Sequence, residues 1–155
     1  MNNPEIQIRA AVSEDAAALT SLIFRSKQSN GYDDAFMELC VDVLRITPEN
    51  LKQRHAFLAE ADNQLLGCAM LDPQDANTAE VCAFFIAPKH KRRGVGKVLW
   101  NKLLSHAQAL GFTQLVLDAD PEAVPFYNRL GFKIIRDTPS EAIPNRVIPH
   151  MARSI

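Results

Sequence analysis

Hydrophobic residues recur at two different spacings along the chain, and each spacing predicts a different kind of element. Residues 55–61, 65–72 and 79–87 are apolar segments rich in strand-forming residues, and turn or loop residues separate them. Three such segments in succession predict an antiparallel meander. Residues 33–45 instead carry the spacing of an amphipathic helix. The pattern therefore predicts a mostly helical first third, followed by a sheet.

Local signals mark where the first elements begin. Residues 6–11 alternate like a short strand. Ser13, followed by two acidic residues, is typical of a helix N-cap, and it predicts a helix through the segment "AAALTSLIFRS". Thr47 and Pro48 predict a second N-cap with proline at the first helical position.

The next predicted helix follows the glycines at positions 94 and 96 and ends at Gly111. Its expected buried stripe consists of Val95, Val98, Leu99, Leu103, Ala107 and Leu110. Polar residues occupy the opposite side, so this helix is expected to cover one face of the sheet.

The last third alternates short strands and helices. Residues 113–118 predict a strand, 122–130 a short helix closed by Gly131, and 132–137 another strand. A final strand is expected around residues 146–151, after a loop punctuated by prolines. The order β-α-α-β-β-β-α-β-α-β-β predicts an α/β or α+β fold around one sheet.

Length and charge narrow the possibilities. A chain of 155 residues is long enough for one substantial core and too short for two ordinary domains, so residues 1–155 are expected to form a single domain. The 17 basic and 18 acidic residues give a net charge of −1, which argues against a generic nucleic-acid or membrane-surface binder.

Cysteines and apolar windows indicate the compartment. Cys40, Cys68 and Cys82 are odd in number and show no CxxC spacing, as expected of reduced buried thiols. The start "MNNPEIQIRA" has no apolar stretch, and no window approaches the roughly 18 apolar residues of a membrane span. A cytoplasmic location is expected, and the oligomeric state, including a homodimer, stays open. The histidines are scattered without metal-ligand spacing, so no metal is expected.

A basic run surrounds the two glycines where a strand gives way to a helix. Its cations are Lys89, Lys91, Arg92, Arg93 and Lys97. A helix that begins at Gly94 presents unpaired N–H groups and a partial positive charge, which favours phosphate binding. A P-loop would need glycine at position 91, and a dinucleotide fingerprint would need it at 99, where Leu99 stands, so both motifs fail.

The same stretch resembles the acetyl-CoA-binding motif of the GNAT family of N-acetyltransferases, (Arg/Gln)-x-x-Gly-x-(Gly/Ala). Lys91 stands where that family usually has Arg or Gln. "IQIRAAVSEDAAAL" is similar to the family's opening strand and helix, and "PFYNRLGF" to its late Phe-Tyr-x-x-x-Gly-Phe signature. The resemblance implies a mixed, mostly antiparallel sheet of about seven strands with helices on both faces, splayed near the acetyl-CoA site.

The resemblance also implies which residues hold acetyl-CoA. The pantetheine arm would add to the free edge of a splayed strand, and the pyrophosphate would sit on the glycine turn. The implied residues are Phe84, Phe85 and Ile86 for the arm, and Lys91, Arg92, Arg93, Gly94, Val95, Gly96 and Lys97 for the pyrophosphate. Asp120 occupies the position of a family Asn that contacts the arm, although a helix cap is the favoured interpretation of an Asp-Pro pair.

The chemistry implied by the family is direct acetyl transfer to a primary amine in a ternary complex. An alkylammonium with a pKa near 10.4 is about three units from neutral at pH 7, so the site needs a base or desolvation. Glu80 matches the base position of some members, and a solvated carboxylate is the alternative. Strict alternation would place Glu80 on one face with Cys82, Phe84 and Ile86. Tyr127 matches the tyrosine that protonates the CoA thiolate, and a core aromatic is the alternative.

The acceptor is expected opposite acetyl-CoA, between residues 26–34 and the final hairpin. Tyr32 and Asp33 are candidate acceptor-binding residues, and Asp34 and Glu141 could also attract a cationic amine. The acceptor could be a small molecule or a peptide amine. A catalytically silent acyl-CoA sensor remains the alternative function, since it would keep the glycines without depending on Glu80 or Tyr127.

Overall fold

The computed structural model describes residues 5–155. The first four residues of the stretch "MNNPEIQIRA", in which no apolar segment was found, lie outside the described part. The first half contains β1 (Gln7–Ala10), a 3₁₀ turn (Ser13–Asp15), α1 (Ala16–Gln28), α2 (Asp34–Leu44), α3 (Pro48–Gln53), β2 (His55–Ala61), β3 (Gln64–Pro73) and β4 (Thr78–Ile86). The second contains a 3₁₀ turn (Pro88–His90), α4 (Val95–Ala109), β5 (Gln114–Asp118), a 3₁₀ turn (Pro121–Ala123), α5 (Val124–Arg129), β6 (Lys133–Pro139) and β7 (Val147–Ser154).

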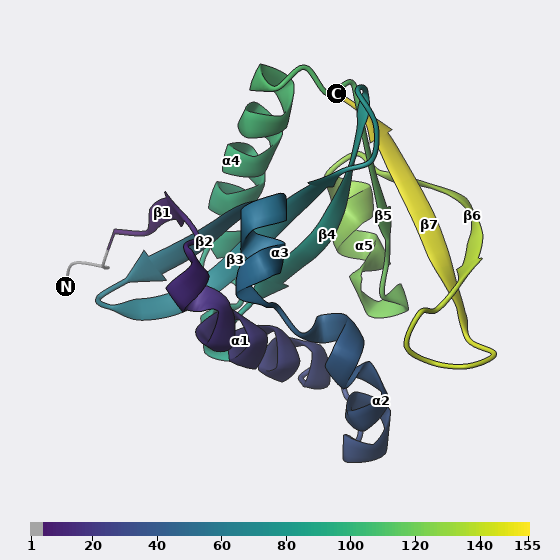
Figure 1. Cartoon of the computed structure of the whole chain (residues 1–155). Helices are drawn as coiled ribbons and strands as arrows, with labels where there is room; N and C mark the ends of the chain where they lie inside the picture. The colour runs from purple at the N-terminus through teal and green to yellow at the C-terminus, as the bar shows by residue number, and fades with distance from the viewer. Residues whose placement is uncertain (1–4) are drawn as a thin grey trace.

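The strands form a seven-stranded sheet in the order β1-β2-β3-β4-β5-β7-β6. Every neighbouring pair is antiparallel except β4 and β5, which run parallel. The strands β2, β3 and β4 form the predicted meander, and β7 inserts between β5 and β6 (Figure 1). The mixed, mostly antiparallel sheet predicted from the sequence is therefore confirmed.

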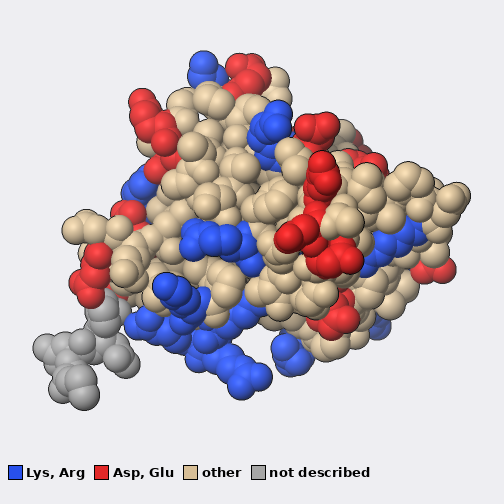
Figure 2. Space-filling model, turned by 90° about the horizontal axis from the view of Figure 1, so that it is seen from below, with Lys and Arg blue, Asp and Glu red and all other residues tan. Residues whose placement is uncertain are grey.

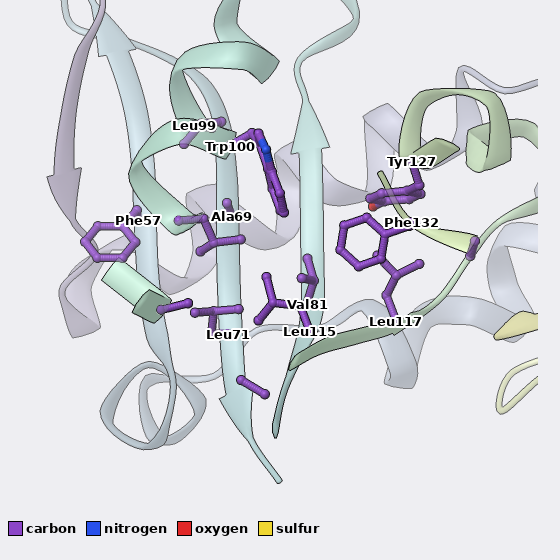
Figure 3. Close-up of a cluster of buried hydrophobic side chains, with 14 of the residues drawn as sticks. Phe57, Ala69, Leu71, Val81, Leu99, Trp100, Leu115, Leu117, Tyr127 and Phe132 are labelled. Atoms are coloured by element: carbon purple, nitrogen blue, oxygen red, sulfur yellow. The ribbon is translucent and has the colours of Figure 1, made fainter. Parts of the chain in front are cut away.

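Helices cover both faces of the sheet and enclose two hydrophobic clusters. The larger cluster joins α4 to residues of β2, β3, β4 and β5, and Figure 3 shows it with Trp100 near Phe132 and Tyr127. The smaller one joins α1 to the opposite face. Each fully buried Leu or Phe in these clusters contributes about 1.5–3 kcal/mol relative to an exposed one. The two clusters fix the sheet between α4 on one side and α1 on the other.

The buried stripe of α4 differs from the predicted one at three positions. Val98 and Leu110 are exposed, whereas Trp100 is buried against Phe132 with ring centroids 5.6 Å apart. The buried positions of α4 are therefore Val95, Leu99, Trp100, Leu103 and Ala107, because the helix turns Trp100 toward Phe132 and turns Val98 and Leu110 toward solvent. Arg153 covers the Trp100 ring at 5.4 Å.

The predicted helix over "AAALTSLIFRS" is confirmed as α1, but its predicted N-cap is wrong. Residues 13–15 form a 3₁₀ turn in which the Ser13 side chain makes no cap, and α1 begins at Ala16. The Asp15 carboxylate instead accepts from the Val12 N–H at 2.8 Å and binds Arg9 at 2.9 Å. The predicted cap of α3 is confirmed, since the Thr47 side chain accepts from the Asn50 N–H and Pro48 is the first helical residue.

A β-bulge at Cys82 changes which side chains of β4 share a face. Met70 pairs with Ala83 and Leu71 with Val81, so Cys82 is the additional residue of β4. The predicted alternation is therefore wrong: Phe84 packs with the α4 cluster and Ala83 with the α1 cluster. Glu80 lies on the α1 side, apart from Phe84.

The sheet splits between β4 and β5. Their parallel pairing covers Thr78 to Glu80 opposite Gln114 to Val116, although β4 continues to Ile86 and β5 to Asp118. Figure 1 shows the two strands together at one end and apart at the other. The main-chain groups of β4 that face this split have no strand partner, as the predicted splay requires.

Two further observations concern the described residues as a whole. Cys40, Cys68 and Cys82 are all free thiols, the first two buried. Across residues 5–155, no helix has the length and apolar character needed to cross a bilayer.

Candidate active site

A cleft of about 680 Å³ occupies the split between β4 and β5. Its walls come from β4, the turn before α4, the start of α4, the region around α5, α2 and the loop between β6 and β7. It contains most of the residues predicted to act in catalysis or to hold acetyl-CoA: Glu80, Phe84, Phe85, Ile86, Lys91, Arg92, Gly94, Val95, Gly96, Lys97, Asp120 and Tyr127. The fold thus gathers side chains that lie up to 47 positions apart in the sequence.

The N-terminus of α4 opens into the cleft with free main-chain donors. Gly94 caps the helix in the left-handed conformation (φ 81°), and Arg92 is also left-handed (φ 68°). The first bond of the helix runs from the Val98 N–H to the Gly94 carbonyl at 3.2 Å, so the preceding N–H groups of α4 have no acceptor among residues 5–155. Consecutive free N–H groups at a helix start form a concave anion site.

Cationic side chains surround these donors, and Nζ of Lys91 also donates to the Ser29 hydroxyl at 2.8 Å. Lys91, Arg92 and Lys97 line the cleft and have exposed side chains. Arg93 does not line it, and its guanidinium donates to Nδ1 of His90 at 2.7 Å. In Figure 2, Lys and Arg side chains gather on one part of the face seen from below, with acidic side chains beside them. The turn therefore suits a ligand with several negative charges.

Two glycines lie beside the cleft where the space for a side chain is limited. A Cβ at Gly96 would meet Phe126 at 3.6 Å, an ordinary contact that narrows the space beside the helix start. A Cβ at Gly67 would lie 2.8 Å from the Phe85 carbonyl oxygen and 2.9 Å from the Ile86 side chain. Gly67 therefore permits the close approach of β3 to the part of β4 that borders the split.

Glu80 lies at the base of the split, on the last pair of the β4–β5 ladder. Burial raises the pKa of its carboxyl group above the ordinary value of 4.5. Nearby charges contribute as well: Asp118, Asp72 and Glu141 raise this pKa and Arg54 lowers it. A carboxyl group of this kind accepts a proton more readily than an exposed one, as a general base must.

A second cavity of about 360 Å³ meets the cleft at Glu80 and lies on the α1 side of β4. Both cavities are lined by Val43, Leu44, Glu80, Cys82, Ala83, Phe85 and Glu141. Arg54, Asp72 and Gln74 line only the second cavity. Its ionisable lining has more acidic than basic groups, which favours a cationic guest.

Tyr127 closes the cleft from α5. Its side chain is 9% exposed and packs edge-on against Phe132 and Phe126, with ring centroids 5.7 and 5.2 Å away. The hydroxyl makes no hydrogen bond within residues 5–155, and no fully buried side-chain N or O atom in that range lacks a partner, so the hydroxyl is accessible from the cleft. Burial, with a smaller effect of the Asp120 charge, raises the pKa of Tyr127, so the phenol keeps its proton at neutral pH.

Asp120 joins three segments at one end of the cleft. Its carboxylate caps the following 3₁₀ turn by accepting from the Glu122 N–H at 2.9 Å, as the sequence favours. It also forms an ion pair with Lys27 and accepts from the Tyr32 hydroxyl at 2.9 Å. Burial alone would raise the pKa of Asp120, but these donors lower it below 3.8.

The two predicted acceptor residues have structural partners. The Tyr32 hydroxyl accepts from Arg146 at 2.9 Å as well as donating to Asp120, and its ring stacks on Phe36 at 4.0 Å. Asp33 caps α2 by accepting from the Phe36 N–H at 2.8 Å. Neither side chain lines the two cavities. Arg146 does line the cleft, so Tyr32 contributes to the cleft only by accepting a hydrogen bond from Arg146.

Sequence reasoning missed two groups of the second cavity, Asp72 and Arg54. A signal for Asp72 was present: folding the hairpin about residue 76 places it opposite Glu80, which is its partner in the sheet. No local signal identifies Arg54, which is the single residue between α3 and β2. Within residues 5–155, no group of three or more His, Cys, Asp or Glu side chains is arranged to hold a metal ion.

Comparisons with known proteins place this geometry in context. One human relative, N-acetyltransferase 8, is 28% identical over 107 residues, covering 63% of this chain and 47% of that protein. The uncharacterized N-acetyltransferase ycf52 of Pyropia yezoensis is 29% identical over 73 residues, covering 47% and 42%. The chain therefore spans about half the length of these curated relatives.

Solved structures share the fold over nearly the whole chain. The PaiA N-acetyltransferase of Thermoplasma acidophilum, in complex with coenzyme A, superimposes with a TM-score of 0.79 at 21% identity and covers 97% of this chain and 99% of that one. The sequence model of the acetyltransferase (GNAT) family matches residues 18–132, which include the split strand, the glycine turn and Tyr127. The chain belongs to the GNAT family of acetyltransferases.

Proposed function

We propose that this protein transfers the acetyl group of acetyl-CoA to a primary amine that binds as an ammonium ion, by direct attack of the amine on the thioester. One observation carries the proposal. A single cleft runs from the free N–H groups of α4 to Glu80 and to the unbonded hydroxyl of Tyr127. These are the groups that a diphosphate, an ammonium and a departing thiolate would need.

The residues present fit acetyl-CoA. The α4 donors, with Lys91, Arg92 and Lys97, would hold the diphosphate. The free edge of β4 between Val81 and Ile86 would bond the pantetheine arm as an added strand. The structure of the Thermoplasma protein, which contains coenzyme A, supports the same use of this fold here.

Glu80 and Tyr127 would divide the proton transfers. Glu80 accepts one proton from the ammonium, which frees the nitrogen lone pair for attack on the thioester carbon. The new C–N bond forms, the C–S bond breaks, and Tyr127 donates a hydrogen bond or its proton to the thiolate. The nitrogen loses a second proton as the amide forms, and this proton accounts for the one that the CoA thiol gains. The proton held by Glu80 is then released to water, so each turnover releases one proton.

The acidic lining of the second cavity supports a cationic acceptor. The amine would approach Glu80 from that side, between α2 and the loop before β7, while acetyl-CoA occupies the cleft above. Val43 and Leu44 border both cavities and offer apolar contact to the body of the acceptor. A small amine and a peptide amine both fit this description.

Calorimetry with acetyl-CoA and a Gly94→Glu variant tests the donor site. The new carboxylate would stand beside the α4 donors and repel the diphosphate, so we expect the Kd for acetyl-CoA to rise more than tenfold. Gly111→Glu is the matched control, because Gly111 is also left-handed (φ 89°) and a Cβ at either glycine would meet nothing within 4 Å. Equal affinity of the Gly94→Glu protein and this control would exclude the α4 donors as the diphosphate site.

Activity should show an acid limb set by Glu80. Because the folded pKa of Glu80 is raised above 4.5, the carboxylate needed for catalysis is lost as the pH falls through that raised value. We expect kcat/KM for a panel of primary amines to decline on the acid side with an apparent pKa above 4.5. Glu80→Gln should remove this limb and lower kcat about 100-fold.

A neighbouring substitution provides the check on this assignment. Asp72→Asn removes a charge that raises the pKa of Glu80, so the acid limb should move to lower pH. Stopped-time CoA-release assays across pH, with thermal melts of each variant, measure both effects. An acid limb that persists in Glu80→Gln at the wild-type position would rule out Glu80 as the base.

A further inference from the structure

Asp118 is a second carboxylate in the cleft that the sequence did not assign. It is the last residue of β5, at the point where β5 has separated from β4. Its side chain lines the cleft and is 36% exposed. After burial, the negative charge of Asp118 is the largest cause of the raised pKa of Glu80. The two carboxylates are therefore close enough to influence each other and to face the same ligand.

Glu80 and Asp118 point to the same side of the sheet. Leu115 and Leu117 of β5 are buried in the α4 cluster, so by alternation Asp118 faces the α1 side, as Glu80 does. Glu80 is paired with Val116, two residues before Asp118. In a regular ladder, a strand spacing of about 4.8 Å and a rise of about 3.3 Å per residue would place the two Cα atoms roughly 8 Å apart, and the split beyond Val116 widens this separation. Side chains of this length can share one ammonium group.

His150 holds Asp118 in place from the neighbouring strand. The two residues are direct partners in the β5–β7 ladder, and Nδ1 of His150 lies 2.6 Å from Oδ1 of Asp118. A carboxylate only accepts hydrogen bonds, so Nδ1 carries the proton and donates it. The His150 side chain is 16% exposed and does not line the cleft. The second oxygen of Asp118 is left for a ligand.

The unbonded Tyr127 hydroxyl is independent evidence that this part of the cleft receives a ligand. Tyr127 is more than nine-tenths buried, and its hydroxyl is accessible only from the cleft that Glu80 and Asp118 also line. A hydroxyl that is accessible from the cleft and has no partner among residues 5–155 can donate a hydrogen bond to a ligand there. The cleft is therefore lined by two carboxylate acceptors and one free hydroxyl donor.

We propose that Asp118, positioned by His150, binds the ammonium group of the acceptor jointly with Glu80, so that the site selects amines that arrive as cations. The inference rests on the proposed acetyl transfer for its chemical setting. The ammonium donates one N–H to each carboxylate. The N–H bond to Glu80 then breaks and its proton passes to Glu80, while Asp118 keeps its hydrogen bond to the nitrogen and undergoes no covalent change. His150 is a positioning residue and does not touch the amine.

Two probes that differ only in the terminal group test the inference: 2-phenylethylamine, a cation at neutral pH, and 2-phenylethanol, which is uncharged. Calorimetry measures the binding of each to the CoA-loaded protein, and CoA release measures turnover of the amine. In Asp118→Asn we expect the Kd and KM of the amine to rise about tenfold, with kcat changed less than about threefold. The Kd of the alcohol should stay unchanged. Asp137→Asn is the matched control, since Asp137 is exposed on β6 and lines neither cavity.

Variants of His150 separate positioning from packing. His150→Gln keeps an N–H donor and should stay within about threefold of the wild-type KM, whereas His150→Leu should resemble Asp118→Asn. Wild-type affinity for the amine in Asp118→Asn would overturn the inference, as would a wild-type protein that binds the alcohol as well as the amine. Asp118-dependent amine binding without turnover of any amine would leave this inference standing and refute the proposed acetyl transfer. Amine turnover that does not change in Asp118→Asn would refute this inference and leave the proposed acetyl transfer standing.

Discussion

Replacing Tyr127 by Phe is expected to lower kcat for amine acetylation by about 100-fold. The phenol is the only side-chain donor of the cleft that is both buried among aromatic rings and without a partner within residues 5–155. Its raised pKa keeps the proton on the oxygen until a thiolate forms beside it. Loss of a positioned general acid costs about two to four orders of magnitude in rate. Steady-state CoA release at saturating acetyl-CoA and amine measures the effect.

The Tyr127→Phe protein should still bind acetyl-CoA, because the ring contacts with Phe132 and Phe126 survive the loss of one oxygen. We expect its Kd for acetyl-CoA to stay within about threefold of wild type and its thermal midpoint to stay within a few degrees. If kcat remained within threefold of wild type under these conditions, Tyr127 would be a core aromatic with no part in the reaction.

Asp120→Ala is expected to lower the free energy of unfolding by about 3–5 kcal/mol. The ion pair that it breaks has side chains only 10% and 14% exposed, so the ammonium of Lys27 would be left desolvated without its partner. The Tyr32 hydroxyl and the Glu122 N–H would lose the same acceptor. Urea unfolding followed by circular dichroism gives the difference at neutral pH.

A surface pair provides the control for this effect. Asp42 and Arg45 lie 3.8 Å apart with side chains 93% and 56% exposed, so Asp42→Ala should cost less than about 1 kcal/mol. Adding Lys27→Met to Asp120→Ala should recover part of the loss, since the buried charge is then gone. Because the folded pKa of Asp120 is depressed, its contribution is complete above 3.8 and disappears as the pH falls through the folded value. An Asp120→Ala protein as stable as Asp42→Ala would refute the buried-pair account.

Local signals in the sequence were sufficient for the donor site and for most of the order of elements, although the predicted order has two helices before β2 where the structure has three. Strand and helix spacings identified β2, β3, β4 and α4, and Gly94 marked the start of α4 because only glycine adopts left-handed backbone at little cost. The phosphate-binding character of that turn follows from helix geometry, which does not depend on distant parts of the chain.

Features that depend on pairing between distant segments could not be read in this way. The bulge at Cys82 has no marker in the alternation of β4, and it overturned the predicted face of Phe84 relative to Glu80. Lys27 and Asp120 are 93 positions apart, so no local pattern predicts their ion pair. The sequence also does not show that Asp118 is paired with His150, because this contact depends on β7 lying beside β5. Tyr32 and Asp33 were chosen for their charge and loop position, whereas the structure pairs Tyr32 with the distant Asp120 and uses Asp33 as the cap of α2.

The narrow contact between β4 and β5 divides the catalytic groups between two halves of the molecule. The α4 donors and Glu80 belong to the half built on β1 to β4, against which α4 packs, while Tyr127 and Asp118 follow or end β5. Three paired positions join β4 to β5. The larger hydrophobic cluster also spans the split, since it contains both Val81 of β4 and Tyr127 of α5. The placing of the proton donor relative to the base therefore depends on the packing of this cluster more than on the short ladder.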